Sequence, residues 1–363
     1  MADTEVEDPC AAEGFSGSVG LRIGAIFIIL VSSTFATLMP IVTRRVRVLS
    51  LPASAFDFAK YFGSGVIIAT AFMHLLAPGA EELSSPCLNS NFQNYTFAFA
   101  FAMISMFMTF IVELLAFRVG SKIASRLAYD PHRGGHHHAN EHDHVSPAIA
   151  AKHRETELLA GSSSSSSPQP DSDDKPAVAE TLPRADDLEV HALEGDVPEL
   201  SAAAREILGV AILEFGVVFH SLIIGLTLAT TSDFKILFIV IIFHQMFEGI
   251  GLGVRLSLLP LRAGSMIPWL GALLYSCITP LGMAIGLGVR NTYNGNSATA
   301  NYITGTFDSV SAGILLYTGL VELLAHEFIF NEKMRKAPLG KVMVNILEVL
   351  TGAGIMALLA RWA

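Results

Sequence analysis

Eight long apolar stretches constrain the fold of this 363-residue chain more than any other feature. A helix that crosses the hydrocarbon core of a bilayer needs about 20 apolar residues. Short polar segments separate most of these stretches, so neighbours in the sequence are expected to pack antiparallel as an all-α bundle. The expected spans are 21–43, 56–77, 96–119, 207–230, 234–257, 266–289, 303–325 and 342–359.

The composition excludes an ordinary soluble protein and a nucleic-acid-binding protein. Hydrophobic residues make up 52% of the chain and charged residues only 15%, against about 25% charged residues in a typical soluble domain. The net charge of -10 is the opposite of the basic surface that nucleic acids require. The three cysteines are too few for a cysteine-rich zinc site.

One connection differs from the others in length and composition. Residues 120–205 are polar and charged and include six consecutive serines, so we expect a disordered loop. The chain then divides into a tail (1–20), three spans (21–119), this loop, and five spans (206–363).

Lysine and arginine indicate the orientation in the membrane. If the N-terminus is extracellular, 19 of the 23 basic residues lie on the cytoplasmic side. The short loops alone give ten against four, and the four exceptions are Arg22, Lys235, Arg290 and Arg361. Because cytoplasmic loops carry the excess of Lys and Arg, both termini are expected outside and the long loop inside.

Two histidines are predicted to meet near the middle of the membrane. An ionisable group at that depth costs about 2.5–3.5 kcal/mol on insertion scales, so each one needs a reason. His220 lies twelve residues before the turn at Ser232, and His244 lies twelve residues after it. With a rise of 1.5 Å per residue, both imidazoles lie roughly 18 Å below that turn, at one depth.

Further polar groups are predicted at a similar depth on the same two helices. Glu248 follows His244 by four residues and shares its face. Glu214 and Ser221 share a stripe on the preceding helix, and Gln245 adjoins His244. Imidazole and carboxylate ligands suit zinc, iron, nickel or copper better than calcium or magnesium. Small residues allow close helix approach, and these helices carry Gly216, Gly225, Gly249, Gly251 and Gly253.

Four stretches of the sequence resemble the ZIP zinc/iron permeases, in particular the fungal zinc and plant iron/zinc branch. Two are specific: His220-Ser-Leu-Ile-Ile-Gly225 and His244-Gln-Met-Phe-Glu-Gly249. The others are Phe62-Gly-Ser-Gly-Val-Ile-Ile-Ala-Thr-Ala-Phe-Met-His74 and Ser309-Val-Ser-Ala-Gly-Ile-Leu-Leu-Tyr317.

The resemblance implies uptake of metal into the cytosol, with His220, His244 and Glu248 as core ligands. It also implies an elevator-like motion of helices one, four, five and six against the other four. Family members with two central ions carry Asn, Glu and Asp where this chain has Ser221, Ile224 and Gln245. We therefore expect a single central ion.

Other polar residues are expected near the two ends of the pathway. His74 and Asp308 are placed near the outer ends of the second and seventh spans, and Glu322 and His326 at the inner end of the seventh. These four residues are candidates for metal access and release, with helix-end hydrogen bonding as the alternative. Asp57 is expected to pair with Lys60.

The segments outside the spans carry two further hypotheses. The loop histidines have the composition of a regulatory metal-binding tract, with a solvated segment without a role as the alternative. They are His132, His136, His137, His138, His142 and His144. Cys10 and Cys87 both lie outside in this topology, where surroundings are oxidising, and are expected to form a disulfide.

The leading interpretation is a plasma-membrane permease that imports Zn²⁺ by alternating access, with the ion and the lipid bilayer as partners. A homodimer is a further expectation. Fe²⁺, Mn²⁺ or Cd²⁺ as cargo stays open, because ligand types do not separate these ions. An intramembrane metalloenzyme is disfavoured, since the chain has no His-Glu-x-x-His motif. A membrane metal sensor without flux is the remaining alternative.

Overall fold

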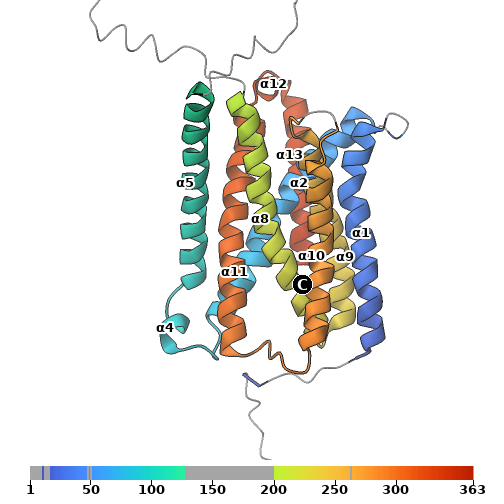
Figure 1. The fold of residues 1–363 in the computed structure, drawn as a ribbon, viewed down its shortest axis with the longest axis vertical. Coiled ribbons are helices and arrows are strands. Elements are labelled where there is room, and N and C mark those ends of the chain that lie inside the picture. Colours follow the sequence, from blue (N-terminus) through green and yellow to red (C-terminus); the bar gives the residue numbers. More distant parts are fainter. Residues whose placement is uncertain are drawn as a thin grey trace, which may run out of the picture. The chain divides into compact units, whose positions relative to one another are not determined.

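The computed structural model describes residues 10–11, 17–46, 49, 51–126, 200–261 and 264–362. Among these residues, eight helical spans are long and apolar enough to cross a membrane, as predicted. The helices run side by side in Figure 1. The histidines from His132 to His144, and the predicted disorder of the long loop, lie outside the described residues.

Helix bounds follow the expected spans closely at most positions. The spans are α1 (Val19–Arg45), α2–η2–α3 (Ala53–Leu83), α5 (Phe97–Arg126), α8 (Leu200–Thr230), α9 (Phe234–Leu258), α10 (Ile267–Val289), α11–η3 (Ala298–Phe330) and α13 (Leu339–Leu359). Two short helices, α4 (Ser90–Gln93) and α12 (Glu332–Arg335), lie in the connections.

The second and seventh spans are longer than the sequence predicted, and each contains a π-helical segment. These segments are η2 (Thr70–Leu76) and η3 (Thr318–Phe330). The complete spans, Ala53–Leu83 and Ala298–Phe330, measure 31 and 33 residues. The placement of His74 and Asp308 near outer helix ends was therefore wrong, and both residues lie well inside their spans.

The helices pack into two groups. In the first group, α8 packs on α10, and α1 packs on both α9 and α10. In the second group, α2 packs on α13, and α11 packs on η2 and α3. The groups meet where α2 contacts α9 and where α8 contacts α11.

Glycines permit the closest of these contacts. At all five glycines predicted for close approach, an added Cβ would lie 3.0 Å or less from a neighbouring atom. Where α2 crosses α9, Gly63 and Gly251 place their Cα atoms so close that neither tolerates a side chain. The small-residue prediction is confirmed.

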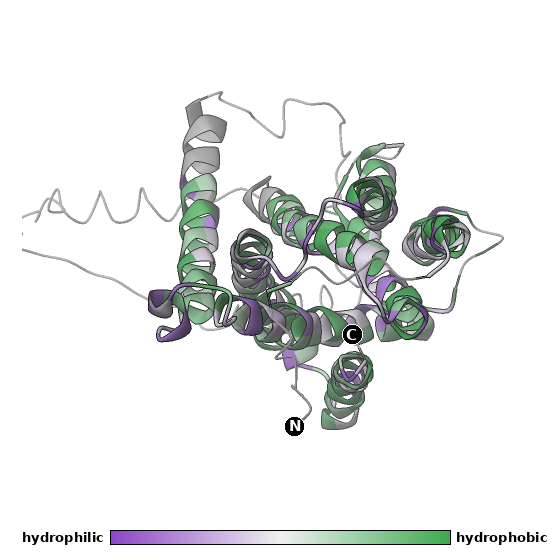
Figure 2. Cartoon of the chain, turned by 90° about the horizontal axis from the view of Figure 1, so that it is seen from below, coloured by the Kyte–Doolittle hydropathy of each residue, from purple (hydrophilic) through white to green (hydrophobic). Residues whose placement is uncertain are grey.

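The outer surface of the helices is apolar. Phe27, Val31 and Phe35 on α1 are each more than 60% exposed, and hydrophobic colouring predominates along the helices in Figure 2. Polar side chains such as Ser33 and Thr37 are buried instead. This inverted distribution suits a bundle surrounded by lipid.

A disulfide joins Cys10 to Cys87, as predicted. The amides of Asn294 and Asn296 donate to the backbone carbonyls of Cys10 and Ala11 at 2.9 and 3.3 Å. The N-terminal segment is thereby held against the α10–α11 connection.

Candidate metal centre

Three side chains from α8 and α9 converge in the interior. His220, His244 and Glu248 are each at most 1% exposed, and their ligand atoms all lie within 4.8 Å of one another. The two imidazole rings are 5.5 Å apart, while His244 Nε2 lies 3.7 Å from Glu248 Oε2. The predicted meeting of the two histidines at one depth is confirmed.

Most polar atoms of this cluster lack hydrogen-bond partners among the described residues. Both ring nitrogens of His220 and His244, the Oε1 atom of Glu248 and the hydroxyl of Ser221 are buried and unpaired. A buried polar group without a partner costs about 1–3 kcal/mol. Imidazole nitrogens and a carboxylate oxygen are the zinc ligands of proteins. The arrangement therefore fits a cation held at the centre of the cluster.

Tyr275 on α10 is a residue of this centre that the sequence analysis missed. Its hydroxyl lies 3.3 Å from Glu248 Oε2 and 2.5 Å from Gln245 Oε1. The Gln245 amide nitrogen donates to the Thr279 hydroxyl. Both ends of the Gln245 amide are thus bonded to α10, so we leave Gln245 out of the ligand set. A tyrosine inside an apolar helix was the available signal, because a buried phenol needs a partner.

The second helix group brings two more candidates against the cluster. The His74 ring lies 4.7 Å from the His244 ring, and its Nε2 atom donates to the Met356 carbonyl at 3.1 Å. Because a carbonyl only accepts, Nε2 carries the hydrogen and Nδ1 keeps its lone pair. Asp308 Oδ1 lies 3.9 Å from His220 Nδ1 and has no hydrogen-bond partner. Both residues adjoin the centre rather than a membrane surface.

Glu214 lies apart from the three converging side chains. Its carboxylate adjoins Gly271 on α10, one helical turn from Tyr275. The structure therefore does not group Glu214 with His220, although both lie on α8. Six residues along α8 separate Glu214 from His220, which corresponds to about 9 Å in depth.

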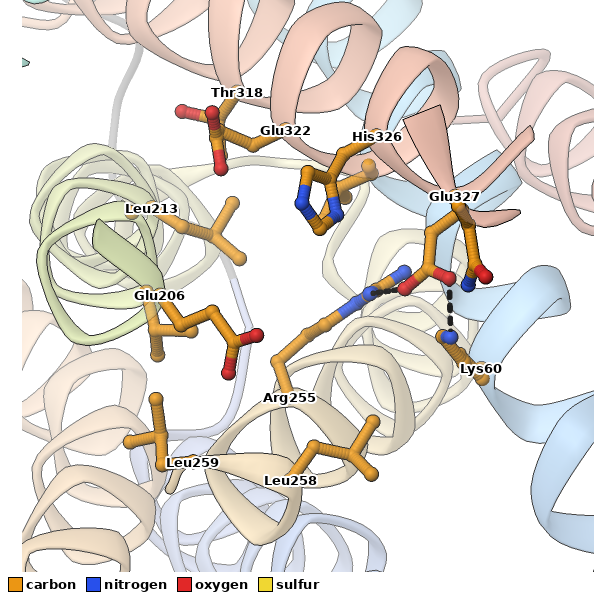
Figure 3. A pocket seen from close by; sticks show the side chains of 14 residues that line it. Lys60, Glu206, Leu213, Arg255, Leu258, Leu259, Thr318, Glu322, His326 and Glu327 are labelled. Atoms are coloured by element: carbon orange, nitrogen blue, oxygen red, sulfur yellow. Dashed lines mark hydrogen bonds and ion pairs between the residues drawn. The ribbon is translucent and has the colours of Figure 1, made fainter. Parts of the chain in front are cut away.

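A cavity of about 260 Å³ lies at the end of the bundle where α2 and α8 begin and α9 and η3 end. Glu322 and His326 line it, as their predicted place at the inner end of the seventh span requires. Figure 3 also shows Glu327 between Arg255 and Lys60. The Lys60 ammonium forms an ion pair with Glu327. The expected partner, Asp57, attracts Lys60 more weakly than Glu327 does.

These features define a class of protein: a multi-pass membrane protein with a buried histidine–glutamate cluster between its helices that could hold a metal ion. A statistical model of the ZIP zinc transporter family matches residues 19–360. The chain belongs to this family.

Relatives from fungi and plants align over nearly the whole chain. Zinc-regulated transporter 1 of Saccharomyces cerevisiae is 39% identical over 96% of this chain and 89% of its own length. Zinc-regulated transporter 2 of the same yeast is 35% identical, covering 99% and 98%. Zinc transporter 9 of Oryza sativa subsp. japonica is 31% identical, covering 100% and 94%.

Proposed function

We propose that this protein imports Zn²⁺ across the plasma membrane into the cytosol, and binds one ion between His220, His244 and Glu248 on the way. The convergence of these three buried side chains, whose ring nitrogens and Glu248 Oε1 have no hydrogen-bond partner, carries the proposal. Its family membership and the names of its relatives support zinc as the cargo.

The distribution of the ligands over the two helix groups supports alternating access. All three ligands belong to α8 and α9, which lie in the first group. His74 and Asp308, which face them, belong to the second group. An ion bound by the three ligands would therefore travel with the first group as it slides past the second, while His74 and Asp308 offer contacts that change during the movement.

The orientation follows from the basic residues. With both termini outside, the cavity lined by Glu322 and His326 faces the cytosol, and the connection between α10 and α11 faces outward. His74 and Asp308 then serve access to the centre, and the cavity serves release.

Uptake of radioactive zinc in cells or proteoliposomes tests the proposal. Glu248→Ala, His220→Ala and His244→Ala should each abolish most uptake while the protein still reaches the membrane. Met246→Ala, one residue from Gln245 on the same helix, is the matched control. Normal uptake by Glu248→Ala would refute the ligand assignment.

Competition separates zinc from the other ions. A tetrahedral site of imidazole and carboxylate suits zinc, and the Irving–Williams order places zinc above Fe²⁺ and Mn²⁺. Excess unlabelled zinc should therefore suppress uptake more than equal Fe²⁺, Mn²⁺ or Cd²⁺. Stronger suppression by Fe²⁺ or Mn²⁺ would identify that ion as the main cargo, and binding without flux would identify a sensor.

A further inference from the structure

Three charged side chains form a buried network beside the release cavity. The Arg255 guanidinium donates to Glu327 Oε1 at 3.0 Å and to the Ser64 hydroxyl at 2.5 Å. The Lys60 ammonium pairs with the other oxygen, Oε2. Figure 3 shows Glu327 held from two sides. Both oxygens of this carboxylate are therefore engaged by cations.

The same cavity presents groups that would bind a passing divalent cation. Glu206 from α8, and Glu322 and His326 from η3, line it, and in Figure 3 the carboxylate of Glu206 and the ring of His326 point into it. Carboxylate and imidazole are zinc ligands. Glu327 directly follows His326 in the sequence, so a free Glu327 carboxylate would add a strong ligand to this set.

A tightly binding set of ligands at this place would oppose transport. A permease site has to bind an ion firmly enough to admit it and weakly enough to let it leave. The network contains two positive charges and one negative charge, so it offsets part of the negative charge that Glu206 and Glu322 bring to the cavity wall. The attraction of the wall for a divalent cation is weaker as a result.

We propose that Lys60 and Arg255 are release-determining residues: by engaging both oxygens of Glu327, they keep this carboxylate from capturing the ion in the cavity. The inference rests on the proposed function, because it assumes that zinc leaves through this cavity. It assigns the two basic residues a role in the rate of transport rather than in binding at the centre.

Zinc binding and uptake of Lys60→Gln and Arg255→Gln, each alone and together with Glu327→Gln, test the proposal. Purified full-length protein is equilibrated with zinc, and bound metal is counted by mass spectrometry. Each single variant should hold about one more zinc ion per chain than the unmodified protein. Its maximal uptake rate per surface molecule should fall on the order of tenfold, with KM unchanged or lower. Adding Glu327→Gln should remove the extra ion and restore the rate.

Two controls separate this role from a structural one. Lys336→Gln breaks an exposed ion pair with Glu332 at the same end of the bundle and should change neither quantity. Loss of a buried partner can also reduce folding, but that effect lowers surface abundance and adds no zinc. An unchanged zinc count, with a rate per molecule equal to that of the unmodified protein, would overturn the proposal.

The binding experiment is repeated in Glu248→Ala protein. There the extra ion caused by Lys60→Gln should persist, because it occupies the cavity and not the centre. Its disappearance would place the extra ion at the centre and overturn the release proposal. The proposed function itself fails through a different result, namely normal uptake by Glu248→Ala.

Discussion

At the scale of single residues, the hydroxyl of Tyr275 is the most informative group in the centre. From α10, this hydroxyl lies within hydrogen-bond distance of both Glu248 and Gln245 on α9. A group that holds a ligand from outside orients the ligand and tunes its basicity. Tyr275 thus acts as a positioning residue for the carboxylate that we assign to zinc.

Tyr275→Phe should raise KM for zinc uptake roughly tenfold, because the hydrogen-bond partners of a metal ligand contribute about 10–100-fold to metal affinity. The maximal rate should change less. Uptake is measured over a range of zinc concentrations and normalised to surface protein. Tyr302→Phe is the matched control, since Tyr302 is partly buried and packs on Phe92 near the start of α11. A KM equal to that of the unmodified protein would exclude the positioning role.

The number of ions at the centre is a second prediction at this scale. Ile224 offers no ligand atom, and the Gln245 amide is bonded to Tyr275 and Thr279. Too few oxygen atoms then surround a second ion. Anomalous diffraction from zinc-loaded crystals should show one peak near His220 and His244. Two peaks a few ångströms apart in that place would contradict the prediction.

At the scale of helices, the sequence predicted the spans and the meeting of α8 and α9, but not their π-helical segments. The length of each apolar stretch predicts the spans, and the distance of each histidine from the turn predicts the meeting of α8 and α9. The spans holding His74 and Asp308 were underestimated because their ends, residues 78–83 and 298–302, are helical although they carry polar side chains such as Glu81, Glu82 and Asn301. The Lys60–Glu327–Arg255 network was missed because it joins residues that are far apart in the sequence.

Helix packing makes a prediction at Gly225, where α8 meets α10. An added Cβ would overlap the Thr279 carbonyl and lie 2.9 Å from the Met283 nitrogen. These are backbone atoms of a helix and cannot move aside cheaply. Gly225→Ala should therefore destabilise the protein by about 1–3 kcal/mol, as overpacking does.

Gly288→Ala on α10 is the matched control, because a Cβ there would have no atom within 4 Å. Thermal unfolding in detergent should show a lower Tm for Gly225→Ala and an unchanged or slightly higher Tm for Gly288→Ala. Equal Tm values for the two variants would show that α8 and α10 pack less closely at Gly225 than the distances to Thr279 and Met283 indicate.

At the scale of the whole molecule, the histidine tract between the third and fourth spans has a predicted regulatory role that rests on its composition alone. Neutral imidazole, with an ordinary pKa of about 6.5, binds zinc at cytosolic pH. Deleting residues 134–144 should leave initial zinc uptake and metal preference intact. Zinc loading is expected to slow uptake by the unmodified protein or to remove it from the surface, and the deletion should weaken this response. A collapse of initial uptake at normal surface abundance would instead place the tract on the conduction path.

The disulfide is the other feature that acts across the whole molecule. Cys10 precedes α1 of the first helix group and Cys87 follows α3 of the second, so the bond links one end of the first group to one end of the second. Eight residues lie between Cys10 and Val19, and an extended chain spans about 3.3–3.6 Å per residue. The tether therefore reaches far enough to permit relative movement, and its main effect should be on stability.

Cys10→Ser should lower Tm in detergent, with a loss on the order of 2–4 kcal/mol for a bond that closes a loop with a sequence separation of 77 residues. Cys87→Ser should match it, and the double variant should be no worse, because all three lack the same bond. Cys277→Ser, at a free and exposed cysteine, should leave Tm unchanged. Zinc uptake per surface molecule should persist in every variant at a temperature well below Tm. A large loss of uptake with an unchanged Tm would show that the bond controls the movement of the two groups rather than their stability.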